Sequence, residues 1–247
     1  MSTTRTADLH GEAVTYEVRR SEKASQTRID AGLDGITLVV PVGLEIDPDD
    51  ILTQKADWVL RQRDRYARYR EEMPERRFEE GECFPVLGEE LPVRVEPTEE
   101  SRMTEEKIQL SASRVEATSI RDELERLYRL AAREHFTARA DHFCEVMGAT
   151  YEQIQIRNQK TRWGSYSPRT GTLSLNFRLL MAPHKIVDYV IAHELAHEEH
   201  PNHGPRFWRL VAQHVPDYQE RGEWLEKNGH RLVFESPCVK DIYTCRS

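Results

Sequence analysis

The chain has 247 residues, enough for one large domain or two smaller ones. Its net charge of -8 gives no support to nucleic-acid binding by charge alone, and no segment approaches the roughly 18 apolar residues of a membrane span. The N-terminus lacks the apolar stretch of a signal peptide, and the four cysteines are scattered without a Cys-x-x-Cys pair. We therefore expect a cytoplasmic protein with reduced thiols.

Alternating and β-branched residues in the first third predict short strands, over residues 14–20, 26–30 and 36–41. Acidic residues at the start and apolar residues along one side predict a helix over residues 49–72. A hairpin is expected over residues 84–95, with its turn at Leu87-Gly88-Glu89, and a further strand over 107–111.

From Thr118 toward Val146, apolar residues recur at helical spacing and predict one long helix. Strands are expected over residues 153–157 and 172–176, the second with Leu173 and Leu175 facing inward. Three helices follow, over residues 183–200, after Gly204, and over 218–228.

Strands dominate before about residue 115 and helices dominate after it. We therefore expect an α+β fold with an N-terminal, mostly antiparallel β region containing a helix, over residues 1–115. A helix-rich catalytic domain with a small sheet is expected over 116–236, followed by a C-terminal tail over 237–247.

The motif that carries chemistry is His193-Glu194-Leu195-Ala196-His197. On a helix, residues four apart lie on one face, so His193 and His197 can bind one metal ion. Glu194 is then placed to act on a metal-bound water rather than as a ligand. The apolar residues that precede the motif recur at helical spacing, which supports its placement on a helix.

The third ligand is less obvious from the sequence. His200 lies further along the same predicted helix, and three ligands in a row do not easily form three corners of a tetrahedron. His203 follows a break at Pro201 and can approach from a new direction, so we favour it. Glu220 and Glu223 are the alternatives, and His200 is expected outside the ligand set.

Segments over much of the chain resemble the YgjP-like metallopeptidase family. Those of the second half are Arg157, Lys160-Thr161-Arg162-Trp163-Gly164-Ser165, Leu175-Asn176, Ala182-Pro183, Asp188-Tyr189-Val190, the His193 motif, Asn202-His203, Phe207-Trp208, Pro216-Asp217-Tyr218 and Trp224-Leu225. Those of the first half are Lys55-Ala56-Asp57-Trp58-Val59, Gly81-Glu82 and Leu87-Gly88. One departure is Tyr166, which stands where the family usually has cysteine.

The resemblance implies a zincin-like domain that binds zinc through His193, His197 and His203, with Glu194 as general base. It also implies a relation to the SprT-like metalloproteases. A metzincin fits less well, because that group has glycine where His200 stands and a later Met-turn, and no methionine follows Met181.

The expected function is a zinc-dependent hydrolase, most simply a metallopeptidase, in which Glu194 activates a zinc-bound water. Tyr166, Tyr189 and Arg162 are candidate donors to the oxyanion of the transition state. If the strand over 172–176 is a sheet edge, it could align an extended peptide.

Two alternatives stay open at this point. Proteins that resemble this one have been described as uridine-triphosphate pyrophosphatases, and the basic residues Arg157, Lys160, Arg162 and Arg169 could hold phosphates. The substrate is accordingly expected to be a peptide or a nucleotide, without a membrane or a strong nucleic-acid signal. The second alternative is a non-catalytic, zinc-stabilised binding module, although closed structural sites usually have four protein ligands.

Overall fold

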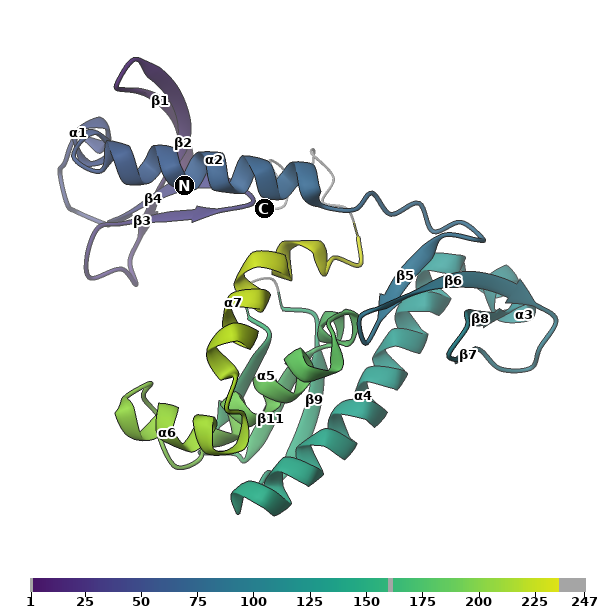
Figure 1. Ribbon diagram of the computed structural model, residues 1–247. Helices are drawn as coiled ribbons and strands as arrows, with labels where there is room; N and C mark the ends of the chain where they lie inside the picture. Colours follow the sequence, from purple (N-terminus) through teal and green to yellow (C-terminus); the bar gives the residue numbers. More distant parts are fainter. Residues whose placement is uncertain (1, 160–161, 236–247) are drawn as a thin grey trace. The chain divides into compact units, whose positions relative to one another are not determined.

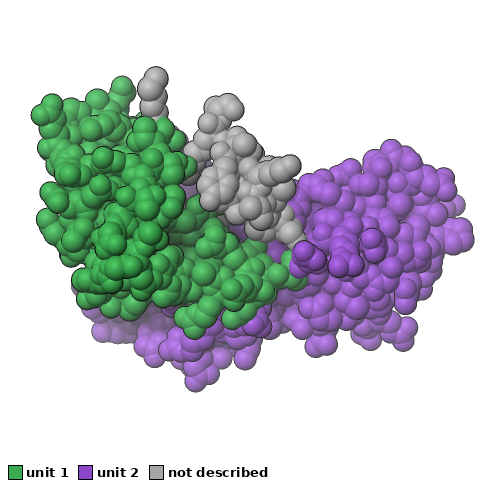
Figure 2. Space-filling model, turned by 90° about the horizontal axis from the view of Figure 1, so that it is seen from above, with its two compact units in different colours: residues 1–74, 236–247 green, residues 75–235 purple. Residues whose placement is uncertain are grey.

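The computed structural model describes residues 2–159 and 162–235, and its sheets and helices confirm the expected α+β class (Figure 1). The chain forms two compact units, shown in different colours in Figure 2. Of the described residues, 2–74 form unit 1, and 75–159 with 162–235 form unit 2. The tail expected over 237–247 lies outside the described residues.

Unit 1 contains a four-stranded sheet in the order β1-β2-β4-β3. Its strands are β1 (Ser2–Leu9), β2 (Glu12–Ser21), β3 (Arg28–Gly32) and β4 (Gly35–Pro41). The last three correspond to predicted strands, and β1 is an additional one. Most of β1 is polar and exposed, and it pairs with β2 through a turn in which His10 and Gly11 both have positive φ. Its strand character therefore comes from pairing rather than from its own hydrophobic pattern.

The helix expected over 49–72 is two helices, α1 (Pro48–Thr53) and α2 (Ala56–Glu72). The Asp47 carboxylate accepts a hydrogen bond from the N–H of Asp49 and so caps α1, and Lys55 leaves helical geometry between the two. Leu52 of α1 and Val59 of α2 are fully buried in the same core. The break therefore lets both helices bury apolar residues against the one sheet.

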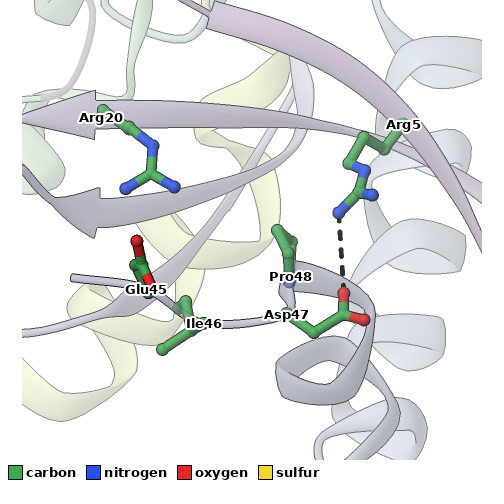
Figure 3. A pocket seen from close by; sticks show the side chains of 6 residues that line it. All are labelled: Arg5, Arg20, Glu45, Ile46, Asp47 and Pro48. Carbon is green, nitrogen blue, oxygen red and sulfur yellow. Dashed lines mark ion pairs between the residues drawn. The ribbon is translucent and has the colours of Figure 1, made fainter. Parts of the chain in front are cut away.

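A pocket of about 470 Å³ opens on unit 1, lined by Arg5, Arg20, Glu45, Ile46, Asp47 and Pro48 (Figure 3). Three of its four charged groups are engaged, because Arg5 lies 3.6 Å from the Asp47 carboxylate and Arg20 donates to the carbonyl of Leu44 at 2.9 Å. The sequence contains no motif that predicts a site here.

Unit 2 begins with a sheet in the order β5-β6-β8-β7. Its strands are β5 (Cys83–Val86), β6 (Glu89–Glu96), β7 (Arg102–Met103) and β8 (Ile108–Ser111), followed by α3 (Ala112–Ala117). The boundary between the units therefore falls at Pro74 rather than near residue 115. The reason is that Phe84, Val93 and Leu110 of this sheet share one core with the helices that follow.

The long helix α4 (Ile120–Met147) crosses unit 2, and a second sheet follows it, made of β9 (Gln153–Arg157), β10 (Gly164–Ser167) and β11 (Thr172–Asn176). The order is β10-β11-β9, so β11 is the central strand. The suggestion that 172–176 forms a sheet edge is therefore wrong, because β10, which was not predicted, pairs along its outer side. Leu173 and Leu175 are buried as expected.

The remaining helices are η1 (Phe177–Met181), α5 (His184–Ala196), α6 (Pro205–His214), α7 (Tyr218–Asn228) and η2 (Gly229–Arg231). Over the described residues, none of the helices combines the length and the apolar composition that crossing a bilayer requires.

Candidate active site

Helix α5 holds the first part of the histidine motif in the core of unit 2. Its residues Ile186, Val187 and Ile191 are fully buried, so the helix is fixed by packing. His193 lies within α5, and His197 lies at its C-cap with helical backbone angles. The two rings therefore leave the same side of the helix one turn apart, with 5.2 Å between their centroids.

The chain turns back directly after the motif. Helix α5 ends at Ala196, four residues before the predicted end at His200. The carboxylate of Glu198 in the turn accepts hydrogen bonds from the N–H and the hydroxyl of Thr150, both at 2.6 Å, which ties the turn to the segment that follows α4. His200 therefore does not lie on the helix, and the turn brings His203 back toward the motif.

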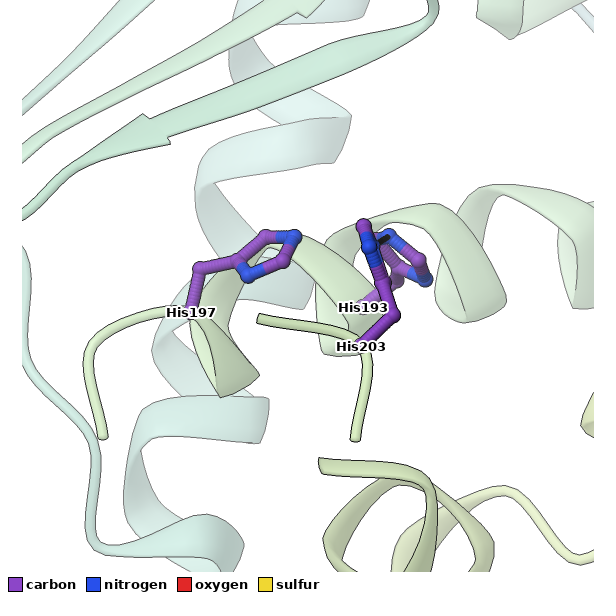
Figure 4. Close-up of side chains that lie close together, drawn as sticks. All are labelled: His193, His197 and His203. Atoms are coloured by element: carbon purple, nitrogen blue, oxygen red, sulfur yellow. Dashed lines mark hydrogen bonds between the residues drawn. The ribbon is translucent and has the colours of Figure 1, made fainter. Parts of the chain in front are cut away.

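His193, His197 and His203 converge, with one ligand atom of each lying within 4.8 Å of the others (Figure 4). The Nε2 atoms of His193 and His203 are 3.0 Å apart. Two nitrogen ligands of tetrahedral zinc lie roughly 3.3 Å apart, since each Zn–N bond is about 2.0–2.1 Å. The three imidazoles therefore fit a zinc ion in donor type and in spacing.

His200 and the two glutamates considered as ligands stand outside this group. Among the described residues, the group that could hold a metal contains the three histidines and neither Glu220 nor Glu223. The carbonyl of His200 lies 3.1 Å from Nδ1 of His197. A proton on that Nδ1 leaves Nε2 free as the ligand atom, so His200 orients a histidine through its backbone.

Aromatic rings enclose the histidines on one side. Phe207 of α6 is fully buried, and its ring centroid lies 4.7–4.9 Å from those of all three histidines. Trp208 stacks between His203, at 5.7 Å, and Tyr218 of α7, at 5.1 Å. These contacts restrict the histidine rings and exclude water from their apolar side.

Burial favours the neutral form of His193 and His197, which is the form that binds metal. Burial and, after it, the neighbouring His197 and His203 lower the pKa of His193 to about 4. Burial also lowers the pKa of His197. Nδ1 of His193 is buried without a hydrogen-bond partner among the described residues, so Nε2, which faces His203, is the nitrogen best placed for a ligand.

Glu194 lies in a dry environment, with 8 % of its surface exposed. Burial raises the pKa of its carboxyl to about 7, partly opposed by a hydrogen bond from the backbone N–H of Tyr166 and by the charge of Arg162. A carboxyl with a pKa near neutrality can both accept and release a proton, as a general base in hydrolysis must.

Gly164 of β10 makes room for this carboxylate, a role that the sequence reasoning missed. A Cβ atom on Gly164 would lie 2.6 Å from Cγ and 2.8 Å from Oε1 of Glu194. The available signal was the glycine itself, since a glycine within a strand often marks the close approach of another group.

We expect Gly164→Ala to displace the Glu194 carboxylate and to lower kcat by about 100-fold, because misplacement of a catalytic group by about 1 Å has effects of this size. Metal content should be unchanged, since the atoms nearest to the added Cβ belong to Glu194 and not to the three histidines that could hold a metal. Steady-state kinetics and metal analysis check both points. Gly204→Ala is the matched control, because a Cβ there meets nothing within 4 Å; equal kinetics of the two variants would contradict the steric argument.

The structure separates the three candidate oxyanion donors. The hydroxyl of Tyr166 donates to the carbonyl of Thr150 at 2.9 Å, so this side chain is engaged elsewhere. Tyr189, four residues before His193 on α5, has its ring 5.8 Å from the His193 ring, and the charge of Glu194 contributes to raising its pKa. Arg162 is exposed and lowers the pKa of Glu194 through its charge.

Two of the basic residues considered as a phosphate clamp lie beyond opposite ends of β10. Arg162 precedes β10 and Arg169 follows it, so the four residues of the strand separate them by roughly 13 Å at about 3.3 Å per residue. Arg157 ends β9, where its side chain bonds that of Gln155. Lys160 lies outside the described residues.

Comparisons with known proteins find two similar solved structures and one matching family. The crystal structure of the metallopeptidase zymogen abylysin of Pyrococcus abyssi is 24% identical, with a TM-score of 0.34, and the match covers 40% of this chain and 99% of that one. The zymogen jannalysin of Methanocaldococcus jannaschii is 21% identical, with a TM-score of 0.35, over 38% and 95% of the chains. A search of curated proteins gives no match. A family model, described as YgjP-like, metallopeptidase domain, matches residues 25–228, and the chain therefore belongs to the YgjP-like metallopeptidase family.

Proposed function

We propose that this protein is a zinc-dependent peptidase in which His193, His197 and His203 hold the metal and Glu194 is the general base. The observation that carries the proposal is the buried Glu194 carboxyl beside three converging imidazoles. Three protein ligands are typical of catalytic zinc, whereas structural sites usually have four. A site with three protein ligands therefore disfavours a non-catalytic, zinc-stabilised binding module.

Zinc, when bound, supplies Lewis acidity that polarises the scissile carbonyl and acidifies water. Glu194 takes a proton from the water whose oxygen attacks the carbonyl carbon. It then transfers that proton to the amide nitrogen as the C–N bond breaks, which yields a carboxylic acid and an amine. The hydrogen bond from the backbone N–H of Tyr166 holds the carboxylate in place for both transfers.

The peptide is proposed to lie along β10, the outer strand of its sheet. Ser165 and Ser167 pair with Ser174 and Thr172, and the carbonyl of Trp163 accepts the N–H of Asn176. In an antiparallel pair, alternate residues direct their backbone groups outward, so Gly164 presents its N–H and carbonyl at the free edge, and Tyr166, whose N–H is held by Glu194, presents its carbonyl. This edge offers an extended peptide backbone pairing beside Glu194.

Tyr189 is proposed as the donor to the oxyanion. Its hydroxyl points toward Gly222 of α7, where a Cβ atom would lie 3.2 Å away, and its side chain makes no hydrogen bond with the described residues. We expect Tyr189→Phe to lower kcat by roughly 100-fold with little change in KM or zinc content, as for loss of one oxyanion donor. Equal kcat in Tyr189→Phe would remove this role.

The decisive test is digestion of an unfolded polypeptide by the zinc-loaded protein, with cleavage sites identified by mass spectrometry. We expect cleavage that a chelator stops and added zinc restores. Release of pyrophosphate from UTP is measured alongside it, since dispersed basic residues offer little support for a nucleotide site. Zinc-dependent UTP hydrolysis without peptide cleavage would overturn the proposal. The free thiols Cys83 and Cys144 suit the reducing cytoplasm, where we propose the enzyme acts.

A further inference from the structure

The residue that the mechanism leaves unused is Arg162, at the start of the strand beside Glu194. Its backbone is firmly held, because the Asn176 side-chain amide donates to its carbonyl at 3.3 Å and the Asn176 backbone N–H donates to that of Trp163 at 2.9 Å. The indole of Trp163 lies under the guanidinium of Arg178, at 5.2 Å. Arg162 thus emerges from a fixed backbone rather than from a free loop.

Arg162 lies close to Glu194 in the fold. A Cβ atom on Gly164 would point at the Glu194 carboxylate, within 2.6 Å of its Cγ. Arg162 lies two residues before Gly164, across a bend at Trp163, so its backbone is near this carboxylate. The charge of Arg162 acts on Glu194 and lowers its pKa, as this placement requires.

The guanidinium of Arg162 makes no ion pair or side-chain hydrogen bond with the described residues, and the residue is exposed. Three arginines of α4 differ: Arg126, Arg129 and Arg139 each bond a carboxylate through Nε and Nη2. In a chain with 43 acidic and 35 basic residues, carboxylate partners are plentiful. A guanidinium left open beside the candidate catalytic group is available to a substrate.

We propose that Arg162 binds a carboxylate of the peptide substrate and makes the enzyme selective for acidic sequences. The inference rests on the proposed peptidase function and specifies its substrate class. Arg162 lies just before β10, and a peptide paired antiparallel to β10 runs in the opposite direction. Arg162 is therefore nearest to residues on the C-terminal side of the cleaved bond, and an acidic side chain one or two positions after that bond is its proposed partner.

The test uses peptides with amidated C-termini that differ only at these positions, with Glu, Gln or Lys. We expect the wild type to cleave the Glu peptide with about tenfold higher kcat/KM than the Lys peptide, and the preference to weaken at high salt. Arg162→Glu should reverse the order, and Arg162→Gln should abolish the preference. Arg169→Glu, an equal charge change at an exposed arginine beyond the other end of β10, should behave like the wild type.

A carboxylate can also come from the C-terminus of a peptide. A Gln peptide that ends at these positions with a free C-terminus is therefore compared with the amidated Glu peptide, to distinguish a terminal carboxylate from an acidic side chain. A preference for the free terminus alone would overturn the assignment to an acidic side chain. Equal cleavage of all peptides, or the same ranking in Arg162→Glu as in the wild type, would overturn the role of Arg162 itself.

Binding of labelled peptides to zinc-loaded Glu194→Gln, followed by fluorescence anisotropy, separates this inference from the proposed function. Tighter binding of the Glu peptide, with the order reversed in Glu194→Gln/Arg162→Glu, supports the proposed role of Arg162 even if the wild type cleaves no peptide. Absence of cleavage by the wild type would count against the peptidase function alone. Cleavage without any charge preference supports the peptidase and refutes Arg162. Circular dichroism and zinc content verify that each variant is folded.

Discussion

Glu194→Gln is expected to keep its zinc and to lose turnover, by roughly 10²–10⁴-fold in kcat, the usual contribution of general acid–base catalysis. Glutamine has nearly the same shape and can still accept the N–H of Tyr166, but it cannot take a proton from water. Glu194 does not belong to the group of side chains that could hold a metal, so the zinc content should stay at the wild-type level. Peptide cleavage and atomic absorption measure the two properties on one sample.

A metal-replete Glu194→Gln protein with wild-type kcat would show that another group takes the proton. Loss of zinc together with activity would instead make Glu194 a ligand. The variant therefore tests the role of the carboxyl group separately from the integrity of the site.

The same substitution should stabilise the metal-free protein at high pH. The pKa of Glu194 rises from 4.5 in the unfolded chain to about 7 in the fold, so the folded state retains a proton that the unfolded state releases. The free energy of unfolding therefore falls as pH rises from 4.5 to about 7 and then stays constant. The total loss is about 3 kcal/mol, since each pKa unit corresponds to about 1.36 kcal/mol. Glutamine is neutral at every pH. In urea unfolding with a chelator present, Glu194→Gln should therefore be more stable than the wild type at pH 8 and equally stable below pH 4.5.

His203→Ala is expected to weaken zinc binding by more than about 100-fold and to abolish cleavage. Even groups that only orient metal ligands contribute about 10- to 100-fold to affinity, and here a ligand itself is lost. Competition with a chromophoric chelator gives the affinity directly. The ring of His203 is exposed, so its removal should leave the fold intact, which circular dichroism checks.

His200→Ala, Glu220→Ala and Glu223→Ala are the controls for the third ligand. His200 contributes its backbone carbonyl, Glu220 is exposed, and Glu223 bonds Lys227 at 3.2 Å, so all three variants should bind zinc normally. Full zinc occupancy in His203→Ala together with loss in Glu220→Ala would assign the third position to α7.

Local patterns predicted most of the elements of the second half. The apolar spacing in α4, the alternation in β11 and the extent of α7 agree with the structure, because each depends on residues close in sequence. The errors occur where distant pairing decides. The polar β1 forms a strand because it pairs with β2, and β10 forms a strand because it pairs with β11. The helix predicted over 183–200 is too long, because α5 ends at Ala196. In the turn that follows, Glu198 bonds Thr150, which is too far away in the sequence for a local pattern to include.

The sequence by itself determined the chemistry of the site, since the spacing of His193, Glu194 and His197 on a helix brings two imidazoles and a carboxyl together wherever the helix lies. Only the tertiary structure decided the rest. It brings His203 to His193, sets Gly164 against Glu194 and places β10 rather than β11 at the sheet edge. It also assigns the strands of residues 83–111 to unit 2, because their apolar faces are buried against α4 and its neighbours. These features depend on contacts between residues far apart in the chain, which local spacing does not encode.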